Sequence, residues 1–489
     1  MGVTEPRTTA ALLFAGGAVL VASALLSRLS ARSGIPLVLG FVGLGIACGS
    51  EGLLHYEFES YELAFKLGCC ALTLILFDAG LQTPVTMFRR YLRPALALAT
   101  VGVAVTAGLT ALVARLLGFG WLEALLLGAI VSSTDAAAVF SVLRAGGVEL
   151  HERVGAILEV ESGLNDPMAV LLTITLTEAI ATGGTLDASS LLSVLRDLAI
   201  GTAAGFAIGK LAVFVLRRVQ LTIAGLYPIL TIGIALLTFG VTTLAHGSGF
   251  LAVYLAAIVI GDAKLPYKDA LVRIHDFVAW GGQVAMFVVL GLLAFPSRLA
   301  SVAVPSMVLA AFGAVIARPV AVALCLLPFR YEPREIVYVG WVGLKGAVPI
   351  VLACIPVIAH APGAARIFDV VFFVVVVSAA LQGGTVRRLT ARLRLGRGSP
   401  RARRASLEIT ATKPLQSELV VFEIDEASAV AGVAVVEIPF PDGAAAMLVV
   451  RDDELIVPRG NTVLEPGDVV HVFCRAADRS LLELLFGKG

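Results

Sequence analysis

The stretch AILEVESGLNDPMAVLLTI, residues 156–174, decides the fold of this chain. It is apolar towards both ends and carries Glu161, Asn165 and Asp166 near its middle. An apolar helix of roughly 20 residues spans the hydrocarbon core of a bilayer, so the stretch predicts a transmembrane helix. Ionisable groups at mid-membrane depth are costly, and they normally face a polar cavity on an ion or proton path. We therefore expect this helix to carry a functional site inside a membrane.

The composition of the whole chain agrees with a membrane protein. Of its 489 residues 58% are hydrophobic and 15% are charged, and the mean hydropathy is +0.93. Soluble globular proteins carry far more charge than this. The net charge of +1 predicts no nucleic-acid partner. The 6 cysteines have neither the spacing of metal ligands nor that of a secreted disulfide framework, so we expect no bound metal beyond a transported alkali cation.

Apolar stretches separated by short polar connections predict thirteen transmembrane helices. The first is expected to be a span rather than a cleaved signal peptide, because no cleavage site follows it. The approximate bounds are 10–27, 35–50, 62–81, 94–117, 121–143, 154–180, 191–216, 223–243, 248–262, 273–295, 302–328, 335–358 and 366–386.

Basic residues predict the orientation of these spans. Short cytoplasmic loops hold the excess of Lys and Arg, and here every second connection is basic. The loop near Glu51 and Glu57 is acidic instead. With thirteen spans this places the N-terminus outside and the C-terminus in the cytoplasm. The basic connections contain Arg28 and Arg32, then Arg89, Arg90 and Arg93, then Arg144 and Arg153, Arg217 and Arg218, Lys264 and Lys268, and Arg330 and Arg334.

The sequence changes character after the last span. Residues 1–388 are expected to form the transmembrane domain, and residues 389–414 an arginine-rich linker suited to anionic lipid. Residues 415–489 contain the short alternating runs ELVVFEI, AVVEIPF, AMLVVR, ELIVP and DVVHVFC, separated by turn residues. They predict a small, β-rich cytoplasmic domain of the α+β class.

Oxygen ligands gather on the sixth span. Glu161 and Asn165 are four residues apart, as are Ser162 and Asp166, so a helix places all four on adjoining strips of one face. Hard alkali cations prefer such oxygen-only sites. The pattern therefore predicts a site for an alkali cation, with a structural ion pair between helices as the alternative.

Two neighbouring features add to this site. The fifth span contains VSSTDAAAV, with Asp135 near its middle. In the sixth span Pro167 has no N–H and would free the carbonyl of Gly163 as a further oxygen ligand. Both features point to a polar centre between the two spans.

The twelfth span contains GWVGLKGAVP, in which Gly343, Gly346 and Pro349 surround Lys345 and predict a break in the helix. Broken helices at corresponding positions of two inverted repeats indicate a transporter site, and the fifth span corresponds to the twelfth. Asp135 would offset positive helix N-ends and Lys345 negative C-ends, which lowers the cost of burying both charges.

Further polar groups fall inside spans or beside them. Arg318 needs an anionic partner, and Glu161 is the obvious candidate, with snorkelling to the interface as the alternative. Asp78 is expected either in a cytoplasmic entry funnel or in a helix-terminal role. We interpret His246, Asp276 and Gln283 as polar contacts within the bundle and assign them no chemistry.

Three of these motifs together resemble the signatures of NhaP-type cation:proton antiporters, over nearly all of the chain: STDAAAV, ESGLNDPMAV and GWVGLKGAVP. The run HDFVAWGGQVAMF with LGLL, together with the appended tail, narrows the resemblance to the potassium/proton branch sometimes called CvrA. The tail itself resembles the regulatory TrkA-C (RCK C-terminal) domain, whose ending is similar to PRGNTVLEPGDVVHVF here.

The resemblance implies a homodimer in the bacterial inner membrane, in which a core bundle of spans four to six and eleven to thirteen moves against a dimerisation scaffold. It implies that Asp166 is alternately protonated and cation-bound. The family commonly has Arg where this sequence has Lys345, so the constant charge of that side chain is a departure from the pattern. The other implied members of the site are Thr134, Asp135, Ser162 and Asn165 as ligands, and Glu161 with Arg318 as a supporting ion pair.

The function expected from these features is the exchange of potassium for protons, with the two ions competing for Asp166. By resemblance to the family, the Asn165–Asp166 pair, in place of the two aspartates of electrogenic relatives, implies one cation for each proton. A sodium/proton antiporter is the alternative. A gated channel is less consistent with the sequence because a TVGYG-type filter is absent. An intramembrane protease is also less consistent with it, because no serine–histidine arrangement or zinc motif is present. We expect no enzyme activity and no cofactor, and leave open a small ligand on the tail.

Overall fold

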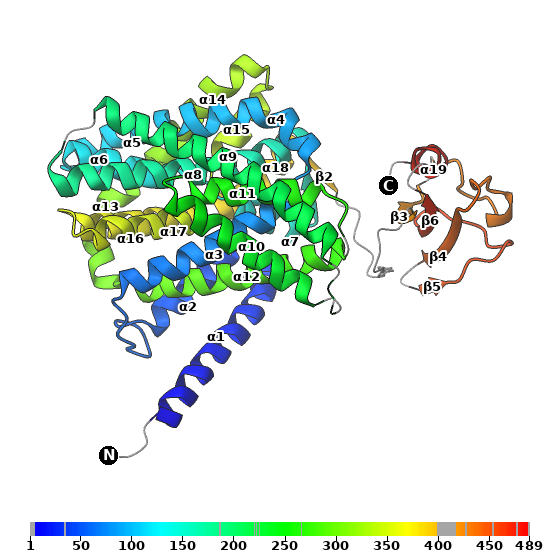
Figure 1. The fold of residues 1–489 in the computed structure, drawn as a ribbon, viewed down its shortest axis with the longest axis horizontal. Helices are drawn as coiled ribbons and strands as arrows, with labels where there is room; N and C mark the ends of the chain where they lie inside the picture. The colour runs from blue at the N-terminus through cyan, green and yellow to red at the C-terminus, as the bar shows by residue number, and fades with distance from the viewer. Residues whose placement is uncertain are drawn as a thin grey trace. The chain divides into compact units, whose positions relative to one another are not determined.

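The computed structural model of this chain describes residues 5–33, 36–184, 187–219, 221, 223, 225–265, 267–398, 417–425, 428–451, 454–475 and 478–487. These residues form two compact units, a helical one that ends at Gly398 and a smaller one that contains the C-terminal sheet (Figure 1). Residues 399–414 of the expected linker lie outside the described ranges.

The helical unit, over its described residues, can be divided into thirteen successive helical segments, some of them broken. This confirms the fold class, and the number is roughly consistent with that expected from the sequence. Eight of its helical stretches are long and apolar enough to cross a membrane, and the other crossings are shorter, broken or more polar. The helices are α1 (Glu5–Ser33), α2 (Leu37–Cys48), α3 (Tyr61–Gln82), α4 (Val85–Ala97), α5 (Val103–Leu116), α6 (Trp121–Ser132), α7 (Ala136–Ala145), α8 (Glu152–Thr182), α9 (Ala188–Arg218), α10 (Leu226–Leu244), α11 (Gly249–Asp262), α12 (Lys268–Leu292), α13 (Pro296–Phe312), α14 (Arg318–Leu326), α15 (Pro333–Trp341), α16 (Val348–Ile358), α17 (Ala364–Ser378) and α18 (Gly384–Leu393).

Two crossings are broken at the predicted places. The fifth consists of α6 and α7, separated by the non-helical residues 133–135, and the twelfth of α15 and α16, separated by residues 342–347. A main-chain hydrogen bond joins the two breaks, because the N–H of Asp135 donates to the carbonyl of Leu344 at 2.8 Å. The sixth crossing, α8, continues through Pro167 as one helix.

Three other crossings contain a π-helical turn. These turns lie at Leu98–Gly102 between α4 and α5, at Gly313–Ala317 between α13 and α14, and at Ala379–Gly383 between α17 and α18. Such turns often occur at functional sites because they change the direction in which the following side chains point. Here the second turn immediately precedes Arg318 and the third contains Gln382, and both of these side chains contact the twelfth crossing.

Among its described residues, the helical unit contains two large apolar clusters. In α8, Ile157 belongs to one cluster and Val170 to the other. In the fifth crossing the same division separates Val139 from Ile130, and in the twelfth it separates Val339 from Ile350. The breaks and the polar middle of α8 therefore lie at the same depth, between two apolar layers.

Glycines allow two close helix contacts. Gly205 of α9 faces α11 so closely that an added Cβ would lie 2.8 Å from the carbonyl oxygen of Ala252, and small residues of this kind are typical of tight helix packing in membranes. Gly163 of α8 lies against the ring face of Tyr254 on α11. The second contact joins the helix of the predicted site to α11.

The small unit is an antiparallel sheet of strand order β3-β6-β4-β5, covered by the helix α19 (Arg479–Phe486). Phe422 of the sheet and Phe486 of the helix stack with ring centroids 5.0 Å apart in its core. This confirms the small C-terminal domain with a sheet. The strands are β3 (Ser417–Glu423), β4 (Ala445–Arg451), β5 (Glu454–Ile456) and β6 (Val469–Arg475).

One expected strand is wrong. AVVEIPF, residues 434–440, forms a short 3-10 turn at Val435–Glu437 with an isolated bridge from Ala434 to Val463. Pro439 has no N–H for a strand ladder, so the run of apolar residues does not extend into a strand.

Candidate functional site

Asp166 lies at the centre of the polar layer, on α8, with 5% of its surface exposed. Its Oδ1 accepts a hydrogen bond from the hydroxyl of Ser133 at 2.5 Å. Ser133 follows the last residue of α6 and belongs to the first break. The carboxylate of α8 is thus held against the end of a broken helix.

Three other residues expected at the site meet in the same place. The amide of Asn165 donates to the hydroxyl oxygen of Thr134 at 2.6 Å. The hydroxyl of Ser162 donates to the carbonyl of Thr134 at 2.9 Å and accepts from the N–H of Ala136 at 3.3 Å. These bonds fix the first break against α8 and place hydroxyl and carbonyl oxygens beside Asp166.

Opposite charges compensate the helix ends at the breaks, as the sequence analysis predicted. The ammonium group of Lys345 donates to the carbonyl of Ser133 at 3.1 Å, at the C-terminal end of α6. Asp135 caps the N-terminal end of α7, where it accepts from the N–H of Ala138 at 3.0 Å. The same carboxylate lies directly against Gly346, two residues before α16. Each charge therefore faces the helix end of opposite sign.

Two side chains of the thirteenth crossing support the second break. The hydroxyl of Ser378 accepts from the backbone N–H of Lys345 at 3.1 Å and donates to Gln382. The amide of Gln382 donates to the carbonyl of Trp341, the last residue of α15, at 2.7 Å. These backbone groups would otherwise be unsatisfied inside a membrane. The sequence analysis missed both residues, whose only signal is their polarity within an apolar stretch.

Arg318 and Glu161 form the expected ion pair. Nη2 of Arg318 lies 2.6 Å from Oε1 of Glu161, and the two side chains are 3% and 1% exposed. Among the described residues, neither the carboxylate oxygens of Glu161 nor Nε and Nη2 of Arg318 make a hydrogen bond of good geometry, so the contact is an ion pair only. The guanidinium also packs on Gly343, where an added Cβ would lie 2.9 Å from Nε. Arg318 is therefore buried beside the second break and does not reach the interface.

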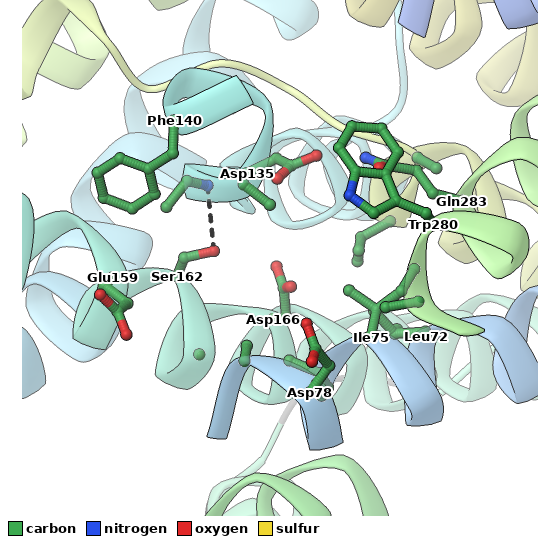
Figure 2. A pocket seen from close by; sticks show the side chains of 18 of the residues that line it. Leu72, Ile75, Asp78, Asp135, Phe140, Glu159, Ser162, Asp166, Trp280 and Gln283 are labelled. Atoms are coloured by element: carbon green, nitrogen blue, oxygen red, sulfur yellow. Dashed lines mark hydrogen bonds between the residues drawn. The ribbon is translucent and has the colours of Figure 1, made fainter. Parts of the chain in front are cut away.

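A cavity of about 280 Å³ is lined by Asp166 and by Arg144, which lies in the last turn of α7. The carboxylates of Asp166 and Asp78 both point into it (Figure 2). Such an excess of negative charge in a cleft attracts cations. Its charged lining residues among those described are Asp78, Asp135, Glu159, Asp166, Asp276 and Arg144.

The cavity changes the interpretation of several residues. Asp78 lines it and accepts from the amide of Gln82 at 2.8 Å, which agrees with the funnel position rather than a helix-terminal role. Asp276 and Gln283, expected only as bundle contacts, line its wall together with Glu159, which the sequence analysis did not single out. Ser133 was also missed, although it adjoins Thr134 in the quoted motif.

The expectation for His246 is wrong. We expected a polar contact within the bundle, but this residue is exposed and has a φ of +54° in the turn after α10. The reason is that α10 ends at Leu244, two residues before it, so His246 belongs to the connection and not to a packed helix.

Comparisons with known proteins agree with this arrangement. The model of the transmembrane sodium/hydrogen exchanger family matches residues 18–392, and the model of the TrkA-C domain matches residues 419–487. The chain is 40% identical over 476 residues to the K(+)/H(+) antiporter NhaP of Alkalimonas amylolytica, which covers 94% of this chain and 81% of that protein. It is 41% identical over 481 residues to the K(+)/H(+) antiporter NhaP2 of Shewanella oneidensis, with 96% and 83% covered.

Solved structures agree on the fold. The structure of the sodium proton antiporter MjNhaP1 from Methanocaldococcus jannaschii matches with a TM-score of 0.68 at 21% identity, over 78% of this chain and 99% of that one. At this identity the likeness concerns the fold alone. Two broken crossings around a buried carboxylate, and a family model that covers most of the chain, lead to one conclusion: the chain is a multi-pass membrane protein of the sodium/hydrogen exchanger family with a C-terminal TrkA-C domain.

Proposed function

We propose that this protein is a monovalent cation:proton antiporter that exchanges potassium for protons. The observation that carries the proposal is the position of Asp166, a buried carboxylate beside hydroxyl and carbonyl oxygens that lines an acidic cavity. The relatives named as K(+)/H(+) antiporters support potassium. Sodium is the second candidate ion, because the chain is also 27% identical over 401 residues to the Na(+)/H(+) antiporter NhaS2 of Synechocystis.

The proposed mechanism is competition for one carboxylate. Asp166 binds either a proton or a cation, so the two ions exclude each other and their movements are coupled. The hydroxyl of Ser162, the oxygens of Thr134 and the carboxylate of Asp135 are placed to replace part of the hydration shell of the cation. Either ion neutralises Asp166, which lowers the cost of moving the occupied site past apolar surroundings.

The fixed charges around the site keep the frame intact while Asp166 changes state. Lys345 and Asp135 balance the ends of the broken helices, and Glu161 and Arg318 balance each other. With these four charges compensated, binding at Asp166 changes the net charge of the site by one. This supports a one-for-one, electroneutral exchange.

The cavity supports a state open to the cytoplasm. Its lining includes Arg144, next to one of the basic connections that the charge pattern assigns to the cytoplasm. We infer the same orientation for the whole protein, with the N-terminus outside and the TrkA-C domain in the cytoplasm. The homology further supports a homodimer in the bacterial inner membrane, and the tail is proposed to regulate transport through a small ligand.

Contacts at the other end of the helical unit support closure there. Arg298 of α13 donates two hydrogen bonds of 3.0 Å to Asp369 of α17. Tyr61 of α3 packs edge-on against Phe368, with ring centroids 5.0 Å apart. The two contacts join the first turns of α13 and α3 to the N-terminal half of α17.

The decisive experiment replaces Asp166 by asparagine. Everted membrane vesicles that contain the protein are acidified, and the recovery of a fluorescent pH probe is followed after addition of potassium, sodium, lithium or rubidium. We expect Asp166→Asn to abolish the recovery, because an amide cannot bind a proton or balance a cation. Asp187→Asn is the matched control, since Asp187 caps α9 in an exposed connection and asparagine also caps helices. A folded Asp166→Asn protein with half the wild-type rate would refute the proposal.

A further inference from the structure

Ser133 contacts both titratable groups at the centre of the site. Its hydroxyl donates to Oδ1 of Asp166 at 2.5 Å, and its carbonyl accepts from Nζ of Lys345 at 3.1 Å. The residue is 1% exposed and directly follows α6, so its carbonyl lies at the open end of that helix. A single residue of the first break thus holds the carboxylate of α8 and the ammonium group of the second break.

The strength of the hydrogen bond from Ser133 to Asp166 depends on which ion is bound. A hydrogen bond to an ionised carboxylate is roughly twice as strong as one to a neutral acceptor. A bound potassium ion leaves Asp166 ionised and preserves the strong bond, whereas a bound proton neutralises the acceptor and weakens it. The hydroxyl therefore stabilises the cation-bound state relative to the protonated state.

We propose that Ser133 is a positioning residue that sets the competition between protons and cations at Asp166. This proposal rests on the proposed function. Loss of the hydroxyl should increase the proton affinity of Asp166, so a higher pH is needed before a cation can bind. We expect the pH of half-maximal exchange to rise by about one unit, and the apparent KM for potassium at a fixed pH below that point to rise roughly tenfold.

The chain supplies a matched control in the preceding residue. Ser132 is also 1% exposed, but its hydroxyl donates to the carbonyl of Ala129 at 2.6 Å within α6. Ser132→Ala removes the same atom from the same helix end without a contact to Asp166. Any effect of general packing loss should therefore appear in both variants, and an effect on ion competition only in Ser133→Ala.

The experiment records exchange rate against pH at several potassium concentrations for wild type, Ser132→Ala and Ser133→Ala. If the profile of Ser133→Ala coincides with that of Ser132→Ala while wild type exchanges ions, Ser133 has no such role. If wild type itself shows no exchange, the proposed function fails instead. Should Ser133→Ala not fold, Ser133→Cys keeps the shape with a weaker donor: a shift to higher pH supports the proposal, and an unchanged profile overturns it.

A second inference concerns how the tail reaches the site. The strand β1 (Val148–Leu150) lies between α7 and α8, and it pairs antiparallel with β2 (Gly396–Gly398), which follows α18. The N–H of His151 donates to the carbonyl of Leu395 at 2.9 Å and extends the pairing. We call this two-stranded sheet the clasp. It fixes the start of the linker to the connection between α7, which Asp135 caps, and α8, which carries Asp166.

The clasp is packed as well as hydrogen-bonded. Leu395 is 1% exposed and belongs to the same apolar cluster as Val139 of α7 and Ile157 of α8. Gly396 has no room for a side chain, because an added Cβ would lie 2.8 Å from Val148 and 3.0 Å from Thr390. The last described residues of the helical unit, Gly396–Gly398, are therefore held in place by both pairing and packing.

We propose that the clasp transmits the state of the TrkA-C domain to the transport site. A shift of β2 would pass through its pairing with β1 to the connection between α7 and α8. A regulatory ligand can shift transport only if it favours one carrier state over the other, and the clasp supplies a mechanical route for that difference. This inference depends on the proposed regulatory role of the tail.

The test combines a lesion in the clasp with removal of the tail. Gly396→Val should force the strands apart, whereas Gly384→Val, in the same segment, adds its side chain to an open, exposed position and is the control. A chain that ends at residue 404 keeps the clasp but lacks the domain. We expect full-length Gly396→Val to show the pH set point of this truncated chain, and the lesion to add nothing further to the truncated chain.

Each outcome separates the two proposals. If Gly396→Val keeps the full-length set point, or if its effect adds to that of truncation, the clasp does not transmit regulation. If full-length and truncated proteins behave alike at every pH and with every nucleotide and ion tested, the regulatory role of the tail fails. If Gly396→Val does not fold, Gly396→Ala introduces the smallest clash and is judged by the same comparison.

Discussion

Removing Glu161 or Arg318 alone should destabilise the protein more than removing both. The two charged groups are in contact at 2.6 Å and are 1% and 3% exposed, so neither gains water when its partner is lost. Charges about 4 Å apart attract by roughly 4 kcal/mol at an effective dielectric constant near 20. Breaking such a buried pair typically costs roughly 3–5 kcal/mol, whereas apolar replacement of both members is often nearly neutral.

The measurement is a double-mutant cycle on the free energy of unfolding, from denaturant titrations of the purified protein in one detergent. Glu161→Gln and Arg318→Met preserve approximate volume, and the double variant completes the cycle. We expect a coupling energy of roughly 3 kcal/mol between the two sites. If the losses of unfolding free energy in the two single variants add up to the loss in the double variant, the two charges do not stabilise each other.

The pair of Arg298 and Asp369 supplies an internal comparison. It has good hydrogen-bond geometry, but its side chains are 37% and 8% exposed, at one end of the helical unit. Water screens a partly exposed pair, and such pairs typically contribute about 1 kcal/mol or less. The same cycle on this pair should therefore give a clearly smaller coupling energy, and an equal value would refute the argument from burial.

Three further predictions follow from the site and the packing around it. Lys345→Arg should retain exchange because it keeps a cationic donor for the carbonyl of Ser133, whereas Lys345→Met should lose at least tenfold in rate in the vesicle assay; equal rates would contradict the charge-compensation argument. Gly163→Ala should lower the thermal unfolding midpoint, because its methyl group meets the ring of Tyr254, and an unchanged midpoint would show that α8 and α11 move apart freely. A chain that ends at residue 404 should still exchange ions, since every site residue precedes it, and complete inactivity of the folded protein would place the tail in the transport machinery.

The fold could be predicted from the sequence because membrane-spanning segments are recognisable by their composition. Apolar length predicts a crossing, and an ionisable group such as Asp166 stands out within one. The break at Lys345 was also visible, since two glycines and a proline stand close to a charge. Pairing of Arg318 with Glu161 followed from the same reasoning, because a buried cation needs an anion and few were available.

Residues that act through the packing of different helices could not be predicted in the same way. Sequence spacing shows which residues share a face of one helix, but not which face turns towards another helix. Glu159 and Asp276 come together only after α8 and α12 surround the cavity. Ser378 directly precedes a π-helical turn and Gln382 lies in it, and both side chains contact the second break. The clasp was invisible because strands of three residues are too short to show a period.

The main-chain hydrogen bond between Asp135 and Leu344 holds the two breaks together without using the side chains that bind the ion. Because it joins an N–H to a carbonyl, no substitution by another residue that retains its N–H removes the bonding groups themselves. The two breaks can therefore stay in register while the side chains around them change during evolution. Preference for one alkali cation over another can drift through the hydroxyls of residues such as Thr134 and Ser162, with the backbone scaffold inherited unchanged. Related chains with different ion preferences should thus differ in these side chains more than in the path of their backbones.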